Sequence, residues 1–287
     1  MEISAVKAFI AIADTGSFSK AAELLFLTQP AVSKRLQLLE TSLNTRLFDR
    51  IGRTITLTEA GKMLLPRARK ILVDIEDSIR AVTNLSTEIT GELRFATSHH
   101  IGLHRLPNIL KGFSHQYPDV RLNISFMDSE NACQLVESGE LELAVVTLPL
   151  SPLPTLKTVL VWDDPLAVTV EKNHPMADRK KITLQQLSQY PAVLPSINTF
   201  TRQIVEKAFS AFDLSLNIYL STNYLETIRM LVSAGIGWSV LPETMLDKNT
   251  CKLTVRELNL QRSLGIVYHR ERTLSNAAMR FVEALQP

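Results

Sequence analysis

The stretch SFSKAAELLFLTQPAVSKRLQLLE, residues 17–40, decides how the N-terminal part of this chain folds. Its first half predicts a short helix capped by Ser17 or Ser19, with an inner face at Ala21, Ala22, Leu24 and Leu25. After a break at residues 27–28, Pro30 suits the first turn of a second helix. Two short helices joined by so short a turn predict a helix-turn-helix.

The second of these helices has an apolar face and a polar face. Val32, Leu36 and Leu39 fall on the apolar face. In a helix-turn-helix, the N-terminal residues of the second helix enter the major groove, where Gln, Lys, Arg and Ser hydrogen-bond to base edges or phosphates. The polar face offers such groups at Gln29, Ser33, Lys34 and Gln37. The alternative is an ordinary helical hairpin with a polar face.

The flanking residues extend this motif. Upstream, residues 3–13 place apolar side chains at helical spacing and end at Thr15-Gly16, a helix stop signal. Downstream, TRLFDRIGRTITLTEAG (residues 45–61) predicts a two-stranded wing with Arg50 and Arg53 at its tip, where they would track the phosphate backbone or the minor groove. We also assign three hydroxyl side chains to the expected DNA-contacting surface: Ser17, Ser19 and Thr54.

A long helix capped by Thr58 is expected after the wing. Its apolar residues recur at the 3-4 spacing of a dimerising heptad seam: Leu65, Ala68, Leu72, Ile75, Ile79 and Val82. Pro66 interrupts the early part and predicts a bend. A dimer would let two helix-turn-helix units read two half-sites. The alternative is that this stripe packs against its own domain.

Composition sets the broad class of the protein. Of its 287 residues, 45% are hydrophobic and 21% are charged, as in a globular protein of two domains. The first 70 residues carry 11 Lys and Arg against six Asp and Glu, whereas the remaining residues carry 20 Lys and Arg against 23 Asp and Glu. A basic N-terminal part of this kind favours a polyanionic partner. No apolar run approaches the roughly 18–20 residues of a membrane span. The N-terminus shows no signal peptide, and two cysteines fit a reducing cytoplasm.

From Gly91 onward, strand-like and helix-like segments alternate, which predicts a parallel, doubly wound α/β sheet. The expected strands are residues 92–97, 120–128, 141–147, 165–170, 192–196, 216–221, 236–242 and 263–270. Ligands of such sheets bind at the carboxyl ends of the strands, beside helix N-termini that favour a carboxylate or a similar anion. The candidate effector-binding residues at these ends are Thr97, Ser98, His99, His100, Thr147, Ser196, Asn198, Thr199, Thr222 and Asn223. The alternative is that the Ser, Thr and Asn side chains simply cap helices.

Residues 17–61 closely resemble the LysR-type transcriptional regulators. The resemblance rests on the ordered set AA…L…TQPAVS…LE…L…LF.R…..LTEAG, and it extends along the chain through GELRFATS and GIGWSVLP. It implies an α/β protein with an N-terminal winged helix-turn-helix (residues 1–58), a linker helix (59–90) and an effector-binding domain (91–287) resembling type 2 periplasmic-binding proteins. The first subdomain would take about 91–161 and 268–287, and the second about 162–267.

The resemblance also implies function. Such a regulator is not an enzyme and needs no cofactor, and an inducer of unknown identity would bind between the two subdomains. Its expected partners are double-stranded operator DNA, a second copy through the linker helix, a further pair of copies in a tetramer, and RNA polymerase. By matching position, the residues that would face DNA are Gln29, Pro30, Ser33, Lys34, Arg35, Arg50 and Arg53.

Three other functions were weighed. An enzyme is disfavoured because the chain has neither a nucleotide-binding glycine motif nor a G-x-S-x-G elbow. His100 and His104 could share a helix face near His99 and bind a metal ion, with Cys133 or a carboxylate near in space, but the sequence shows no further ligand set, so no metal site is predicted. A solute-binding protein would not need the basic N-terminal module. A redox sensor would need a reactive thiol, and neither Cys133 nor Cys251 has an activating cation beside it in the sequence.

Overall fold

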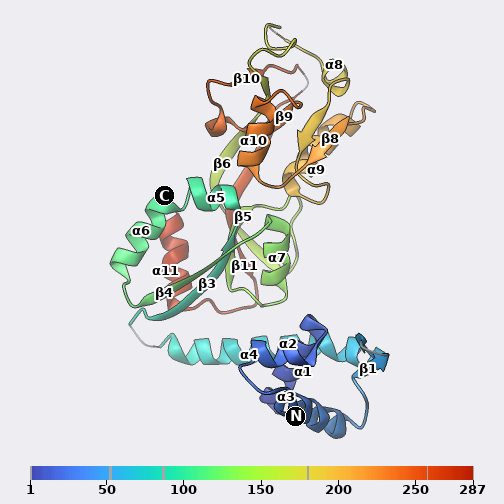
Figure 1. The fold of residues 1–287 in the computed structure, drawn as a ribbon. Coiled ribbons are helices and arrows are strands. Elements are labelled where there is room, and N and C mark those ends of the chain that lie inside the picture. Colours follow the sequence, from blue (N-terminus) through green and yellow to red (C-terminus); the bar gives the residue numbers. More distant parts are fainter. Residues whose placement is uncertain (1, 52–53, 86–87, 180, 257, 287) are drawn as a thin grey trace. The chain divides into compact units, whose positions relative to one another are not determined.

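The computed structural model describes residues 2–51, 54–85, 88–179, 181–256 and 258–286. The contacts between residues divide the chain into two compact units, residues 1–85 and 86–287 (Figure 1). The division falls close to the expected start of the effector-binding region at residue 91. Among the described residues, no helix is both long and apolar enough to cross a membrane.

The first unit is a winged helix-turn-helix followed by a long helix, as the sequence predicts. Its elements are α1 (Ile3–Thr15), α2 (Phe18–Leu24), α3 (Gln29–Leu43), β1 (Phe48–Ile51), β2 (Thr54–Leu57) and α4 (Glu59–Thr83). Gly16 ends α1 in the left-handed region at φ 61°. Ser17 caps α2 by accepting a hydrogen bond from the Lys20 amide, whereas Thr28 stands at the N-cap of α3 without a side-chain bond.

Several residues of the family-like motif hold the wing against the helices. The carboxylate of Glu40 accepts a hydrogen bond from the Leu47 amide at 2.7 Å. The Thr58 hydroxyl donates to the carbonyl of Arg46 and accepts from the amide of Gly61. A Cβ on Gly61 would lie 2.2 Å from the carbonyl oxygen of Leu47, so only glycine permits this close approach. This part of the motif is therefore structural.

The predicted heptad stripe of α4 divides into two parts. Ala68 is buried in the core of the first unit, and Leu65 and Leu72 pack against that core. The early part of the stripe therefore packs against its own domain. Farther along the helix, the side chains of Ile79 and Val82 are 58% and 69% exposed. The unpaired apolar stripe is therefore confined to the C-terminal half of α4.

The second unit begins with a parallel α/β arrangement. Strands β4 and β5 both pair parallel with β3, which confirms the expected parallel register here. The elements of this first subdomain are β3 (Gly91–Thr97), α5 (His99–His104), α6 (Pro107–Gln116), β4 (Val120–Phe126), α7 (Ser129–Glu137), β5 (Leu143–Thr147) and the closing α11 (Asn276–Leu285).

The second subdomain has its own hydrophobic core, built around Trp238, Val205 and Phe209. Strands β7 and β8 pair parallel within it. Its elements are α8 (Leu184–Ser188), β7 (Ala192–Leu194), α9 (Phe200–Ser210), β8 (Ile218–Ser221), α10 (Leu225–Ser233), β9 (Ser239–Pro242), the short 3₁₀ helix η1 (Glu243–Met245) and β10 (Thr250–Leu253).

Two long strands, β6 (Leu156–Glu171) and β11 (Leu260–His269), run through both subdomains (Figure 1). They pair antiparallel with each other, and β11 also pairs antiparallel with β5. The main sheet is therefore mixed, in the order β10-β6-β11-β5-β3-β4, and the expectation of a wholly parallel sheet is wrong. Leu264 and Ile266 of β11 belong to the hydrophobic core of the first subdomain.

Candidate functional site

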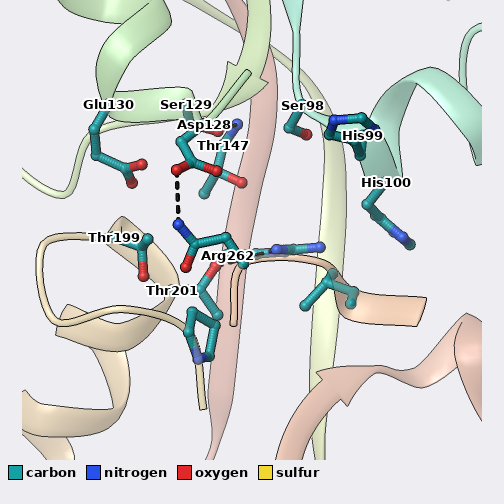
Figure 2. A pocket seen from close by; sticks show the side chains of 13 residues that line it. Ser98, His99, His100, Asp128, Ser129, Glu130, Thr147, Thr199, Thr201 and Arg262 are labelled. Atoms are coloured by element: carbon teal, nitrogen blue, oxygen red, sulfur yellow. Dashed lines mark hydrogen bonds between the residues drawn. The ribbon is translucent and has the colours of Figure 1, made fainter. Parts of the chain in front are cut away.

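A pocket lies where the two subdomains of the second unit meet (Figure 2). The space inside it that a water-sized molecule can occupy is about 50 Å³, and its lining residues come from both subdomains. Six of the sequence-predicted residues line it: Ser98, His99, His100, Thr147, Thr199 and Asn223. The structure therefore brings these six strand-end residues together at one pocket.

The other four predicted residues are not among those that line the pocket: Thr97, Ser196, Asn198 and Thr222. Thr97 is buried beneath it, where its hydroxyl donates to the carbonyl of Val145 at 2.8 Å. The backbone amide of Ser196 donates to the side chain of Asn223 at 2.9 Å. Thr97 and Ser196 thus support the pocket from behind.

Sequence reasoning missed part of the lining: Asp128, Ser129, Glu130, Pro195, Thr201, Leu225 and Arg262. The first three directly follow strand β4, so the same strand-end rule, applied to that strand, would have found them. Arg262 is different because it lies inside strand β11, where nothing in the local pattern distinguishes it.

Arg262 is the buried cation of the pocket, with 6% of its surface exposed. Its Nε atom donates to Asp164 at 2.7 Å and its Nη1 atom to Thr201 at 3.1 Å. Burial lowers the pKa of the guanidinium, and the carboxylate of Asp164 opposes that shift. Arg105 also binds Asp164, at 3.1 Å. The Nη2 atom of Arg262 is buried without a hydrogen-bond partner in the described chain.

Two helices begin at the pocket. Ser129 is the first residue of α7, and Thr199 is the N-cap of α9. The Thr199 hydroxyl accepts from the Arg202 amide, and the Ser129 hydroxyl accepts from the Thr147 amide at 3.1 Å. Both hydroxyls therefore fulfil local structural roles, whereas the hydroxyl of Ser98 makes no side-chain cap bond to α5.

Two acidic side chains connect the subdomains across the pocket. Asp128 accepts a hydrogen bond from the Asn223 amide at 2.7 Å, drawn dashed in Figure 2. The carboxylate of Glu130 accepts from the backbone N–H of Phe200. Burial raises the pKa of Glu130, and the hydrogen bond from Phe200 acts against that rise. Glu130 thus brings negative charge to the N-terminus of α9, the kind of position that favours an anion.

The cysteines do not form a redox pair in this structure. Cys133 is buried in the first subdomain, and Cys251 packs against the core of the second. Burial, and then the carboxylates of Glu130 and Glu137, raise the pKa of the Cys133 thiol to about 12. Reactive thiols have lowered pKa values, so Cys133 has the properties of a structural cysteine.

The polar face of α3 is open to solvent. Gln29, Pro30, Lys34 and Gln37 are exposed, whereas Ser33 and Arg35 are half-buried. Helical spacing places Gln29, Ser33 and Gln37 in one strip, with Arg35 on the opposite flank of the helix.

The remaining predicted DNA contacts lie on α2 and on the wing. On α2, the exposed Ser19 donates a hydrogen bond to Gln29 at 3.3 Å, whereas Ser17 serves as the cap. On the wing, the whole of Arg53 and the side chains of Arg50 and Thr54 lie outside the described residues.

Comparisons with known proteins agree with this architecture. Residues 86–287 match the family described as LysR substrate binding domain, and residues 3–62 match Bacterial regulatory helix-turn-helix protein, lysR family. The HTH-type transcriptional activator CmpR of Synechocystis sp. is 31% identical over 96% of this chain and 92% of its own length. A transcriptional regulator encoded in the ibpB-leuC intergenic region of Azotobacter vinelandii is 61% identical over 107 residues, 37% of this chain and 74% of its own.

A solved structure extends the comparison to the whole chain. The crystal structure of full-length CbnR complexed with its target DNA superposes with a TM-score of 0.65 over 99% of each chain, at 21% identity. At that identity the likeness shows the shared fold. The two matched domains together cover nearly the whole sequence, and the relatives are transcriptional regulators rather than enzymes. The chain therefore belongs to the LysR family of DNA-binding, effector-binding transcriptional regulators.

Proposed function

We propose that this regulator responds to a small carboxylate or similar anion that binds in the pocket between its two subdomains. The observation that carries the proposal is Arg262, whose buried Nη2 atom faces no hydrogen-bond partner among the described residues. A buried donor left unpaired costs about 1–3 kcal/mol, and an anionic ligand would recover that free energy. Asp164 and Thr201 already hold the rest of the guanidinium in place.

Polar groups around Arg262 support the same ligand class. The helix α7 begins at the pocket, and a helix N-terminus favours negative charge. Ser98 and Thr147 line the opposite side in the first subdomain and supply hydroxyl groups for a ligand. Asp128 and Glu130 would select against a ligand with several negative charges, because like charges repel. A monocarboxylate with further hydroxyl or amide groups fits this set best.

The mechanism we infer is a population shift. The contacts Asp128–Asn223 and Glu130–Phe200 join the two subdomains. An effector that binds groups of both subdomains stabilises one inter-subdomain angle over the others. In a tetramer, such a change would alter the spacing of the helix-turn-helix pairs on DNA.

Assembly forms a second part of the proposal. The exposed Ile79 and Val82 of α4 form an apolar stripe suited to a second copy of the same helix. We propose a dimer through this stripe and a tetramer built from two dimers, acting on operator DNA in the cytoplasm, with RNA polymerase as a further partner. Two-fold pairing would match a partly palindromic operator.

The expected DNA contacts are of two kinds, to bases and to phosphates, according to the chemistry of each side chain. We propose that Gln29 and Ser33 read bases in the major groove and that Lys34 and the wing residue Arg53 bind phosphates. Gln29→Ala should then change base preference, whereas Lys34→Ala should weaken binding to all sequences alike. Equal losses on every operator variant for both substitutions would contradict the groove assignment.

The ligand proposal is tested by a thermal-shift screen of the full chain against small carboxylates, including amino acids and aromatic acids. At about 100 times its dissociation constant, a ligand that binds only the native state adds about 2.7 kcal/mol to the unfolding free energy. Ser98→Ala should weaken the hit, because it removes a pocket hydroxyl that makes no cap bond to α5. The control is Ser210→Ala, an exposed serine near the C-terminal end of α9. A screen without a hit, or equal binding by Ser98→Ala, would overturn the proposal.

A further inference from the structure

Three potential metal ligands converge beside the pocket. His100 and His104 lie one turn apart on α5, and Glu226 lies in the first turn of α10, so the group joins the two subdomains. One potential ligand atom from each residue lies within 4.8 Å of the others. The sequence shows the histidine pair, but Glu226 is 122 positions from His104 and is brought to it only by folding.

The spacing of these atoms suits a single ion. His104 Nε2 lies 2.9 Å from Glu226 Oε1, and His100 Nδ1 lies 3.9 Å from the same oxygen. Ligands bind a tetrahedral Zn²⁺ at about 2.0–2.1 Å, which places neighbouring ligand atoms about 3.3 Å apart. The two observed distances bracket that value. The half-exposed His104 has room to adjust its side chain around an ion.

His100 is a second, independent indication of a ligand. Only 4% of its surface is exposed, and neither ring nitrogen has a hydrogen-bond partner in the described chain. An imidazole nitrogen that is buried without a hydrogen-bond partner is available to bind a metal ion. The nearby carboxylate of Asp164 offsets part of the positive charge of Arg262 and Arg105.

We propose that His100, His104 and Glu226 bind a divalent transition-metal ion of the Zn²⁺ class at the junction of the two subdomains. Imidazole ligands select such ions over Mg²⁺ and Ca²⁺, which prefer oxygen ligands alone. Three protein ligands leave one position open for water or for another ligand. His100 also lines the effector pocket, so the ion lies at the edge of that pocket and links α5 to α10.

The test uses the full chain without a histidine tag, dialysed against a chelator, and then titrated with Zn²⁺ and with Co²⁺. We expect one ion per chain by calorimetry and visible d–d absorption when Co²⁺ binds. His104→Gln and Glu226→Gln each remove one ligand and should weaken binding at least about tenfold. Both side chains are partly exposed, so these variants should fold. The control is His115→Gln, an exposed histidine on α6.

Wild-type affinity in both ligand variants would overturn the proposal, and so would an equal loss in His115→Gln. Absence of Zn²⁺ and Co²⁺ binding to the wild-type chain would overturn it as well. The carboxylate screen, run in the presence of chelator, reports on the pocket alone. Failure of the metal site and failure of the effector proposal are therefore separate results.

Discussion

Gly61 lies where α4 passes the backbone of Leu47, and there is no space for a side chain. A Cβ at this position would meet the Leu47 carbonyl oxygen at 2.2 Å and a methyl group of Leu57 at 2.8 Å. Because backbone cannot move aside as a flexible side chain does, Gly61→Ala should lower the unfolding free energy by about 1–3 kcal/mol. Urea unfolding followed by circular dichroism measures the change.

The matched control is Gly112→Ala on helix α6, where a Cβ would meet nothing within 4 Å. That substitution should raise the unfolding free energy by about 0.5–1 kcal/mol, because alanine loses less backbone freedom than glycine in a helix. Equal stability of the two variants would show that Leu47 does not constrain position 61.

The pKa of His100, held near 4 by burial and by Arg262, makes stability depend on pH. In the unfolded chain this histidine binds a proton below about pH 6.5, whereas in the folded chain it stays neutral down to about pH 4. The unfolded state therefore binds more protons in this window, and acid favours unfolding. The contribution of His100 to the unfolding free energy is therefore complete above pH 6.5 and is lost as the pH drops toward 4.

Charged groups that face His100 are Arg262, Asp164, His104 and Glu226. The measurement compares the unfolding free energy of the wild type and of His100→Asn between pH 7 and pH 4.5, with chelator present. We expect the wild type to lose up to about 1.4 kcal/mol more per pH unit than the variant. Parallel pH profiles would contradict a neutral, buried His100.

The residues of the pocket differ in how far sequence alone reveals them. Ser98, Thr147 and Thr199 are found because each follows the carboxyl end of a strand, where α/β sheets bind ligands. Arg262 has no such signal, since its partner Asp164 lies 98 positions away and its importance comes from burial beside that carboxylate. Long-range pairing of this kind leaves no local pattern in a single sequence.

The strands β6 and β11 explain why the prediction of a parallel sheet is wrong, since they pair antiparallel with each other. In β6, the residues buried continuously are Leu166–Val170, and these form the strand segment that the sequence predicts. The preceding part is mostly exposed or half-buried and contains Asp163, Asp164 and Pro165. It therefore resembles a loop in sequence, although antiparallel pairing with β11 keeps it extended.

The exposed apolar residues in the C-terminal half of α4 should form the dimer interface. Ile79→Glu places a charge in the stripe formed with Val82 and should shift the dimer toward monomer, because an unpaired charge is costly in an apolar interface. Sedimentation velocity measures the change. Met63→Glu is the control, since Met63 is 63% exposed on another face of the same helix. A dimer that survives Ile79→Glu, or one equally disrupted by Met63→Glu, would contradict the proposed seam.

At the scale of the whole molecule, the basic N-terminal quarter should make operator binding strongly dependent on salt. Each phosphate contact releases counterions, so the logarithm of the affinity falls with the logarithm of the salt concentration by about 0.9 per contact. Lys34→Ala should reduce this slope by about 1. Lys207→Ala, the same charge change on an exposed residue of α9, should leave it unchanged. Identical slopes for Lys34→Ala and the wild type would exclude a phosphate contact at Lys34.

A ligand bound between the subdomains should change how the chain binds its operator. The most direct measurement is a DNase I footprint with a DNA-bending assay, made with and without a carboxylate that stabilises the chain in the thermal-shift screen. We predict that saturating ligand changes the footprint or the bend for the wild type, and that Ser98→Ala needs a higher ligand concentration for the same change. A footprint and a bend unaffected by saturating ligand would contradict the claim.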